Sequence, residues 1–166
     1  MARKHALLSA SSAARWIACP PSARLNAEKS DTPSAYAAQG TDAHMLCEYK
    51  LRKALGERVR DPTKHLTSYD TEMEECAEAY CQFVMEQVEQ FRAESKDTMV
   101  SVEQRVDFSA FVPDGFGTAD TLIISGKKVC IVDYKHGKGI EVSADHNPQM
   151  MCYALGCIQM FDGLYD

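Results

Sequence analysis

The sequence predicts a single α/β domain of the α+β kind, in which helices flank a mixed sheet that starts with antiparallel strands. Residues 117–135 contain two β-branched runs joined by a Gly-containing turn, which is a hairpin signal. A third strand-like segment precedes them, and long amphipathic stretches occupy 34–55 and 71–94. With 166 residues and 45% hydrophobic content, the chain is long enough for one domain, residues 1–166, with a buried core.

Two short helices are expected near the N-terminus. Clustered serines at the start of 9–18 are typical helix caps, and Trp16 gives this segment an apolar side chain to bury. A further helical turn covers 22–28. Arg15 and Arg24 are each available for a phosphate or for a surface ion pair, and for either arginine alone the ion pair is the more common role.

A long helix is predicted over 34–55. His44 and Glu48 are four residues apart and therefore share one face of it. A single histidine on an amphipathic helix is more often a core or surface residue than a metal ligand. We interpret Gly40 as a point where another backbone approaches closely.

The middle of the chain predicts a helix followed by a strand. Residues 71–94 carry an apolar stripe, which is expected in the core, and an opposite face of glutamates, which is expected in solvent. The alternation in 98–108 predicts a strand that pairs with the hairpin. Glu103 lies in that strand, where it is either an exposed strand residue, which is the favoured interpretation, or a residue with access to the acidic cluster described next. A last helix is expected over 144–160.

The hairpin carries an acidic residue at one end of each strand. Asp120 opens the first strand and Asp133 closes the second, so antiparallel pairing brings their carboxylates together, with Lys135 on the same face as Asp133. Two close carboxylates repel each other unless a cation lies between them, and oxygen ligands suit magnesium or manganese. The alternative is a solvated hairpin end with an ordinary ion pair, because the same acid-x-Lys spacing also occurs in predicted helix at 48–50 and 94–96.

Composition and charge narrow the class of protein. The seven cysteines are scattered and include no C-x-x-C pair, which favours reduced thiols in a cytoplasm over a disulfide framework or a zinc site. We find no export signal and no segment long enough for a membrane helix. The net charge of −6 is uneven, because Lys and Arg outnumber Asp and Glu only in the first 60 residues. A basic front half permits a phosphate-bearing partner.

The order of the motifs resembles a known family. Along the chain stand a helix with Gly-x-x-x-His-x-x-x-Glu, a strand, a Gly-x-x-Asp strand, an Asp-x-Lys strand and a helix with Gln-x-x-x-Tyr. This order is similar to that of the RecB-like branch of the PD-(D/E)XK nuclease superfamily, over nearly the whole chain. More narrowly it resembles the phage- and prophage-encoded exonuclease-like proteins of that branch, including the opening with Trp16 and Cys19-Pro20-Pro21-Ser22. The resemblance implies a restriction-endonuclease-like core.

The resemblance also implies a site. Its metal ligands for Mg²⁺ or Mn²⁺ are His44, Asp120, Asp133 and the backbone carbonyl of Tyr134. Lys135 is the implied catalytic lysine, which orients water and stabilises charge. Gln149 and Tyr153 are implied to lie beside the site and to help place the DNA and the lysine, and Glu48 is a secondary acid. The implied catalytic set is therefore Asp120, Asp133, Lys135, Gln149, Tyr153 and Glu48.

The expected function is that of a metal-dependent DNA nuclease, an exonuclease that hydrolyses phosphodiester bonds in phage recombination or DNA processing. Its expected place is the cytoplasm of a bacterial or phage-infected cell, and its expected partners are DNA and phage recombination proteins, without a membrane. The alternative is a nuclease-fold DNA-binding or scaffold module that keeps the site but does not cut. An unrelated metal-binding structural protein is a third reading, which the order of the motifs disfavours.

The sequence departs from the family in two ways. Some relatives hold an iron–sulfur cluster with three cysteines after the nuclease core, and because this sequence has no such triplet we expect no iron–sulfur cluster. The family core also continues after its last helix into a further strand, which would begin at 163–166 here. We therefore expect a core that is truncated after its last helix, with an open sheet edge through which the chain self-associates.

Overall fold

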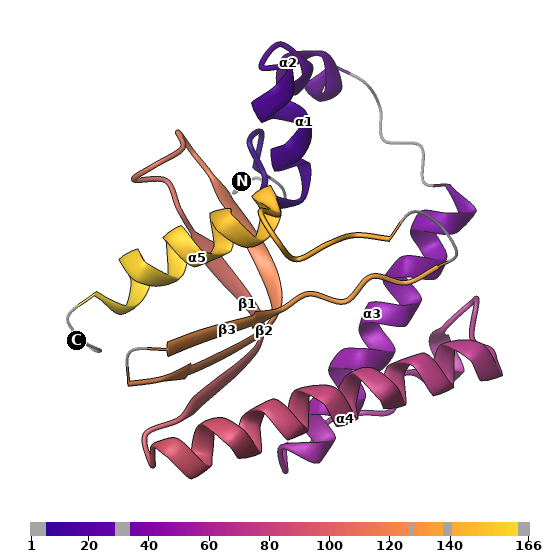
Figure 1. The fold of residues 1–166 in the computed structure, drawn as a ribbon. Helices are drawn as coiled ribbons and strands as arrows, with labels where there is room; N and C mark the ends of the chain where they lie inside the picture. Colours follow the sequence, from indigo (N-terminus) through magenta and orange to yellow (C-terminus); the bar gives the residue numbers. More distant parts are fainter. Residues whose placement is uncertain (1–5, 29–33, 127, 138–140, 163–166) are drawn as a thin grey trace. The chain divides into compact units, whose positions relative to one another are not determined.

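The computed structural model describes residues 6–28, 34–126, 128–137 and 141–162. Its fold is mixed α/β, with a three-stranded sheet in the order β1-β2-β3 (Figure 1). The elements in chain order are η1 (Ala10–Ser12), α1 (Ala13–Ala18), α2 (Ser22–Ala27), α3 (Ala35–Ala54), η2 (Thr63–His65), α4 (Thr71–Glu94), β1 (Met99–Asp107), β2 (Phe116–Ser125), β3 (Lys128–Val132) and α5 (Pro148–Phe161). No helix in these ranges has both the length and the apolar character that crossing a bilayer requires.

The sheet is antiparallel throughout the described residues, where the sequence predicts a mixed sheet. The reason is that short turns connect its successive strands, and strands joined in this way run in opposite directions. Within the described part of the chain β1 and β3 are the two edge strands. Self-association through such an edge stays a prediction, and the segment 163–166, where a further strand is expected, lies outside the described residues.

The predicted hairpin is confirmed, with shifted ends. β2 and β3 pair antiparallel from Thr121 opposite Val132 to Ser125 opposite Lys128, around a turn at Gly126. The paired part of the hairpin ends at Thr121 and Val132, one residue short of Asp120 and Asp133, so the predicted side-by-side placement of their carboxylates stays a prediction. β3 ends at Val132, however, so that Asp133 and its neighbours follow the strand instead of closing it.

The chain contains two compact units that alternate along the sequence. The first comprises Met1–Asp31, Gln104–Ala119 and Val142–Asp166, and the second comprises Thr32–Glu103 and Asp120–Glu141. Strands β1 and β2 each contribute to both units. The sequence predicts one domain over residues 1–166, and the division into two compact units does not test that prediction.

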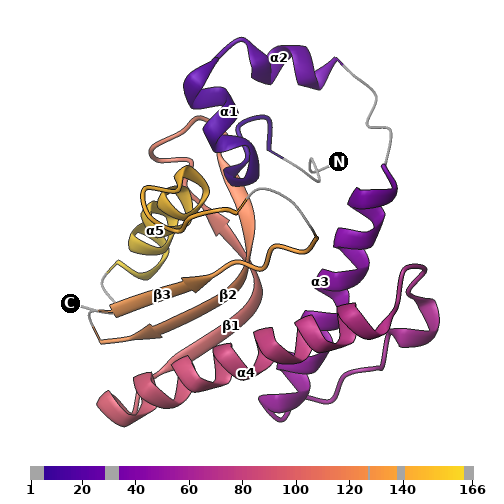
Figure 2. The same cartoon turned by 45° about the vertical axis from the view of Figure 1, so that its right-hand side comes forward.

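The core of the second unit lies mainly between α3 and α4, which lie side by side in both ribbon views (Figures 1 and 2). The apolar stripe predicted for α4 is buried, with Phe91 partly so. Ile123 of β2 completes this core from the sheet. The buried residues of the cluster are Ala43, Leu46, Cys47, Leu51, Met73, Ala77, Tyr80, Val84, Val88 and Ile123. Because one face of α3 is closely packed, the helix is fixed in place, and so is the direction in which the side chains on its other faces project.

A buried acid ties α3 to the loop that precedes α4. The Asp42 carboxylate accepts hydrogen bonds from the backbone N–H of Thr67 (2.8 Å), the hydroxyl of Thr67 (2.9 Å) and the backbone N–H of Ser68 (2.8 Å). A carboxylate that is nearly inaccessible to solvent is tolerated only with such donors. The loop is thereby anchored two residues before His44 along α3.

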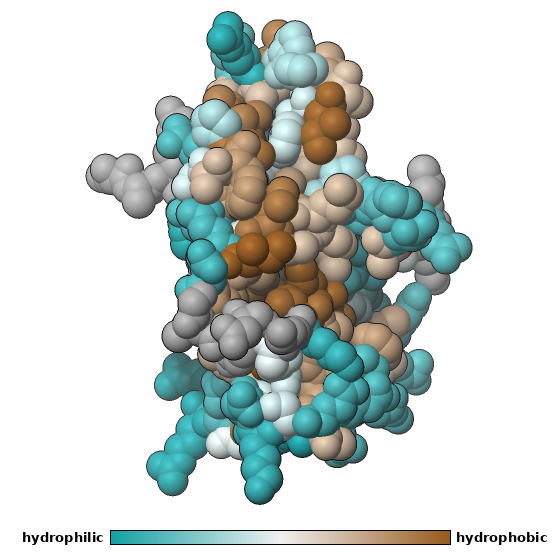
Figure 3. Space-filling view, turned by 60° about the vertical axis from the view of Figure 1, so that its left-hand side comes forward, coloured by the Kyte–Doolittle hydropathy of each residue, from teal (hydrophilic) through white to brown (hydrophobic). Residues whose placement is uncertain are grey.

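In the first unit, α5 packs by one face and exposes an apolar stripe on another. It begins at Pro148, four residues after the predicted start, because Asn147 caps it by accepting from the N–H groups of Gln149 and Met150. Its buried residues are Cys152, Tyr153, Gly156 and Cys157. The exposed stripe consists of Met151, Leu155 and Ile158, and brown residues gather on this side of the molecule in Figure 3. An exposed apolar stripe of this kind is typical of contact surfaces.

Two glycines differ in how tightly they are packed. A Cβ added at Gly156 would lie 2.3 Å from Val106 Cγ1 and 2.8 Å from the carbonyl oxygen of Asp107. Gly40 has open space around it, so the interpretation of Gly40 as a close-approach site is wrong. The close approach of a helix to the backbone occurs instead at Gly156, where α5 meets β1.

We expect Gly156→Ala to lower the free energy of unfolding by about 1–3 kcal/mol, because the methyl group overpacks the contact with β1. The matched variant Gly40→Ala should raise it by up to about 1 kcal/mol, because alanine favours the helix and meets no neighbour. Urea unfolding followed by circular dichroism measures both. Equal effects of the two variants would contradict the packing described for α5.

Candidate metal centre

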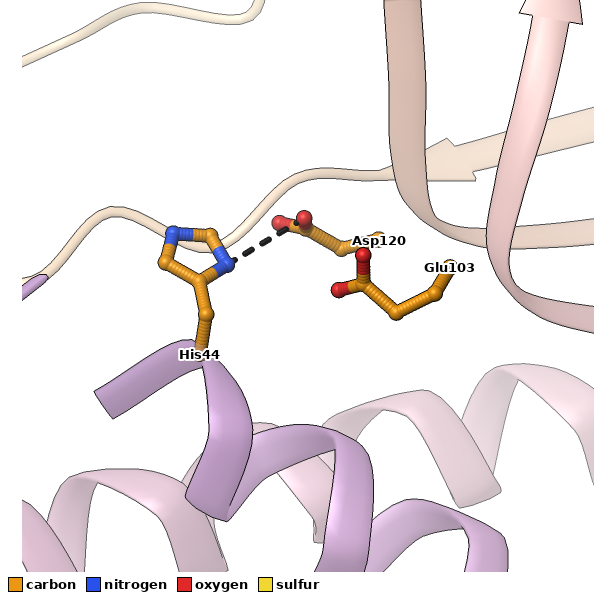
Figure 4. A group of neighbouring side chains, drawn as sticks. All are labelled: His44, Glu103 and Asp120. Carbon is orange, nitrogen blue, oxygen red and sulfur yellow. Dashed lines mark ion pairs between the residues drawn. The ribbon is translucent and has the colours of Figure 1, made fainter. Parts of the chain in front are cut away.

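His44 and Asp120 form the centre of the candidate site. His44 projects from α3, and its Nδ1 lies 3.2 Å from Oδ1 of Asp120 on β2 (Figure 4). The other carboxylate oxygen of Asp120 accepts a hydrogen bond of 2.6 Å from the backbone N–H of Tyr134. The Asp120 side chain is only 12% exposed, so these two donors compensate for its loss of water.

Glu103 is the third member of this group. Its carboxylate points toward the same space as the imidazole of His44 and the carboxylate of Asp120 in Figure 4, and one ligand atom from each residue lies within 4.8 Å of the other two. The sequence interpretation favoured an exposed strand residue for Glu103, with access to the acidic cluster as the alternative. The residue is instead half-buried, and its φ of 53° departs from the extended conformation of the rest of β1.

The alternation of β1 therefore does not predict where the Glu103 side chain points. A strand residue with positive φ no longer follows the period of two on which the sequence interpretation depends. The only sequence signal for Glu103 was an acidic residue in a strand next to the predicted hairpin. The change in backbone direction that brings it to His44 is visible only in the structure.

The electrostatics of the group favour bound positive charge. Burial, followed by the nearby charge of Asp120, raises the pKa of Glu103 from 4.5 to about 6. The hydrogen bond to Asp120 raises the pKa of His44 above its usual 6.5, although burial acts in the opposite direction. A raised pKa of the acid and a raised pKa of the histidine both indicate an excess of negative charge, which a cation would offset.

Asp133 and Lys135 form a pair beside this group. Asp133 Oδ2 lies 2.5 Å from Lys135 Nζ, and the side chains are 8% and 48% exposed, respectively. Burial raises the pKa of Asp133, and Lys135 offsets part of that rise. Among the described acidic residues, Asp133 lies outside the group of mutually close ligand atoms, in which Glu103 takes the place predicted for it.

Tyr134 connects the two parts of the site. Its ring stands edge-on to the rings of His44 and Tyr80, with centroid separations of 5.6 Å and 5.3 Å. Its hydroxyl group is 2.9 Å from Nδ1 of His136. Aromatic contacts of this geometry restrain the His44 imidazole, while the Tyr134 N–H restrains Asp120. The role of the Tyr134 carbonyl as a metal ligand stays a prediction.

Glu48 has a local partner on its own helix. Its carboxylate accepts a hydrogen bond of 2.8 Å from Arg52 Nε, four residues along α3. Arg52 also donates to the carbonyl of Val102 (2.9 Å), the residue before Glu103. Glu48 therefore helps to hold Arg52 against β1, and of the described ligand atoms its own are not in the close group.

Gln149 and Tyr153 belong to the first unit, where they contact each other and β2. The Tyr153 hydroxyl donates to the carbonyl of Thr118 (2.6 Å), and Gln149 Nε2 lies 3.3 Å from that hydroxyl. A Cβ added at Gly117 would lie 2.9 Å from Tyr153 Cε1. The glycine of the Gly-x-x-Asp motif therefore makes room for the tyrosine of the Gln-x-x-x-Tyr motif. Their catalytic role stays a prediction.

The donor set fits a divalent cation. Two ligand atoms that are each about 2.1–2.4 Å from one ion lie at most about 4.8 Å apart. The nitrogen of His44 and the oxygens of Glu103 and Asp120 meet this limit. One nitrogen and several carboxylate oxygens suit Mn²⁺ or Mg²⁺ better than a thiolate-preferring metal, and all seven cysteines are free thiols outside this group.

We expect Glu103→Gln to stabilise the metal-free protein at neutral pH. The raised pKa means that the folded state disfavours the Glu103 carboxylate, so stability falls as the pH rises through about 6. Removing this charge should raise the free energy of unfolding by about 1 kcal/mol above about pH 7, after allowance for solvent screening at a half-exposed group. Below about pH 4 the gain should vanish, because the carboxyl group is then protonated in both states.

The measurement is urea unfolding in EDTA across this pH range, with exposed Glu89→Gln as the matched control. Repeating it with Mn²⁺ adds a second readout, since a ligand that binds only the folded state stabilises it. Glu103→Gln should lose much of that metal-dependent gain, whereas Glu89→Gln should keep it. A destabilised metal-free variant with an intact metal response would refute the place given to Glu103.

Comparisons with known proteins place the chain in a family. No solved structure matches it. Residues 5–166 match the family described as "Protein of unknown function (DUF2800)", which is nearly the whole length of the chain. A match of this extent, over both compact units and every residue of the candidate metal centre, shows that the chain belongs to the DUF2800 family.

Proposed function

We propose that this chain is a metal-dependent DNA nuclease with a restriction-endonuclease-like core of the PD-(D/E)XK type. The observation that carries the proposal is the group of three ligand atoms from His44, Glu103 and Asp120, each from a different element. Beside it the Asp133–Lys135 pair supplies the acid-x-Lys motif directly after the second strand of the hairpin. Exonuclease action in phage recombination or DNA processing is the specific role that the motif order supports.

The proposed reaction is hydrolysis of a phosphodiester bond. The diester is anionic, so an attacking water meets unfavourable charge both at the phosphate and on the departing oxygen. His44, Glu103 and Asp120 would hold a divalent cation, which would supply charge to offset that of the phosphate and lower the pKa of a water bound to it. The protein's own task is to keep the three side chains in place, which it does through the contacts of Asp120 and Tyr134.

Lys135 has a different proposed role. Its ammonium group is half-exposed while Asp133 holds it at 2.5 Å, so it is positioned at the rim of the acidic group. From there it orients the attacking water and stabilises negative charge that develops at the phosphate. Lysine suits this role because its charge is compact and its donors rotate.

We expect metal binding to release a proton. The His44 imidazole must be neutral to donate a nitrogen lone pair to a metal ion, and the hydrogen bond to Asp120 raises the pKa of His44 above 6.5. The affinity for Mn²⁺ should therefore rise as the pH increases through the pKa of His44. Calorimetric titration in buffers of different ionisation enthalpy measures both the affinity and the proton release.

The matched variants are His44→Ala and His65→Ala, since His65 is an exposed histidine on η2. The first should lose the proton release and most of the affinity, and the second should keep both. Mn²⁺ binding that is unchanged in His44→Ala would remove His44 from the ligand set.

We expect Lys135→Ala to separate metal binding from cleavage. The variant keeps His44, Glu103 and Asp120, so Mn²⁺ should still bind. Cleavage of DNA should fall by roughly a hundredfold or more, as for the loss of one electrostatic stabiliser. Lys96→Ala is the matched control, because Lys96 is an exposed lysine with the same acid-x-Lys spacing behind Glu94.

Cleavage is measured on radiolabelled single- and double-stranded DNA with Mg²⁺ or Mn²⁺. If Lys135→Ala cuts as well as the unaltered chain, the lysine is only the ion-pair partner of Asp133. If the unaltered chain binds the metal and DNA but does not cut, the protein is a nuclease-fold binding or scaffold module instead.

A further inference from the structure

The first unit contains a cavity that is separate from the candidate metal centre. It has a volume of about 620 Å³ and lies among the N-terminal segment, α1 and α2. This volume falls in the range of roughly 300–1,000 Å³ that is common for small-ligand sites. Its lining includes Leu7, Arg15 and Arg24, which are exposed, so the cavity opens to solvent.

The cavity carries a positive charge. Arg15 and Arg24 both line it, and neither forms an ion pair with a carboxylate in the part of the chain that the structure describes. Among the lining residues that the structure describes, Glu28 is the one acidic residue, so the two guanidinium groups leave a net positive charge there. Guanidinium groups bind phosphate oxygens through two parallel hydrogen bonds, which makes paired arginines typical phosphate ligands.

The cavity also has an aromatic wall. Trp16 lines it and is half-buried, and its indole N–H donates a hydrogen bond of 2.9 Å to the carbonyl of Ser9. This bond holds the ring in one orientation without occupying its faces. An aromatic ring that is held beside cationic groups is the usual arrangement for stacking a nucleic-acid base next to its phosphate.

A polar atom in the lining lacks a partner within the described residues. Ser22 lines the cavity, and its Oγ is buried without a hydrogen bond to any of them. Buried hydroxyl groups are normally paired, because an unpaired one has lost its water without compensation. A ligand oxygen in the cavity would accept this hydrogen bond.

We propose that this cavity binds one nucleotide of a single DNA strand. Arg15 and Arg24 hold the phosphate, the Ser22 hydroxyl donates to a phosphate oxygen, and the base stacks on Trp16. A free phosphate ion would use the arginines and Ser22 but would leave the aromatic wall and much of the volume without contact. The identity of the ligand as DNA rests on the proposed function, whereas the phosphate-binding chemistry rests on the cavity itself.

The test uses the fluorescence of Trp16, which is the only tryptophan of the chain. The full chain is titrated with a short oligothymidylate in EDTA, so that no metal-dependent cleavage takes place. We expect quenching that weakens as the salt concentration rises, because phosphate contacts release counterions. Thymidine monophosphate should compete more weakly than the oligonucleotide, and inorganic phosphate more weakly still.

Charge-matched double variants identify the site. Arg15→Ala/Arg24→Ala should lower the affinity at least about tenfold, the effect of losing a charge-assisted hydrogen bond. Arg58→Ala/Arg60→Ala removes the same charge from exposed arginines outside the cavity and should change the affinity little. Arg15→Lys/Arg24→Lys keeps the charge without the paired geometry and should bind with intermediate affinity. Thermal unfolding verifies that each variant is folded.

Three outcomes would overturn the proposal. The first is an oligonucleotide that does not quench Trp16, and the second is an equal loss of affinity in the two alanine pairs. The third is inorganic phosphate that competes as well as the oligonucleotide, which would make the cavity a site for a free anion. Quenching in EDTA without any cleavage in Mn²⁺ would refute the proposed nuclease function and support the nucleotide site in the cavity. Cleavage in Mn²⁺ without quenching would support the nuclease function and refute the nucleotide site.

Discussion

The buried carboxylate of Asp120 is the interaction on which the candidate site depends. A carboxylate with so little contact with water is tolerated only if donors replace the water it has lost. Here one oxygen faces the imidazole of His44 and the other accepts from the backbone N–H of Tyr134. Asp120 thus couples a helix, the strand that carries it and the segment after β3. A displacement of any of these elements would leave the charge without compensation.

The residues around Asp120 restrict the movement of these elements further. Tyr134 places its ring between those of His44 and Tyr80, and the Tyr80 hydroxyl lies 2.7 Å from the hydroxyl of Thr121, the next residue after Asp120. α4 contributes Tyr80 to the same core that fixes α3. Packing and hydrogen bonding therefore constrain the same side chains around Asp120. Contacts of this kind, one layer behind the ligand atoms, keep a metal site in the geometry that its ion requires.

The acidic group and the basic cavity divide the chemistry of the chain between its two units. Excess negative charge at His44, Glu103 and Asp120 would favour a divalent cation and by itself would repel a nucleic-acid backbone. The arginine pair of the first unit provides the opposite charge, in keeping with the excess of basic residues in the first 60 positions. A net charge of −6 is therefore compatible with a phosphate-bearing partner, because local charge and not the total determines such contacts.

The sequence by itself determined the helices α3 and α4 and the hairpin of β2 and β3. These features depend on local periodicity and turn chemistry, which neighbouring residues encode. Only the tertiary structure decided that Glu103 joins His44 and Asp120, that Arg52 binds the carbonyl of Val102, and that Arg15 and Arg24 share a cavity. A positive φ and the packing of distant segments have no signature in local patterns, because they follow from how the elements meet.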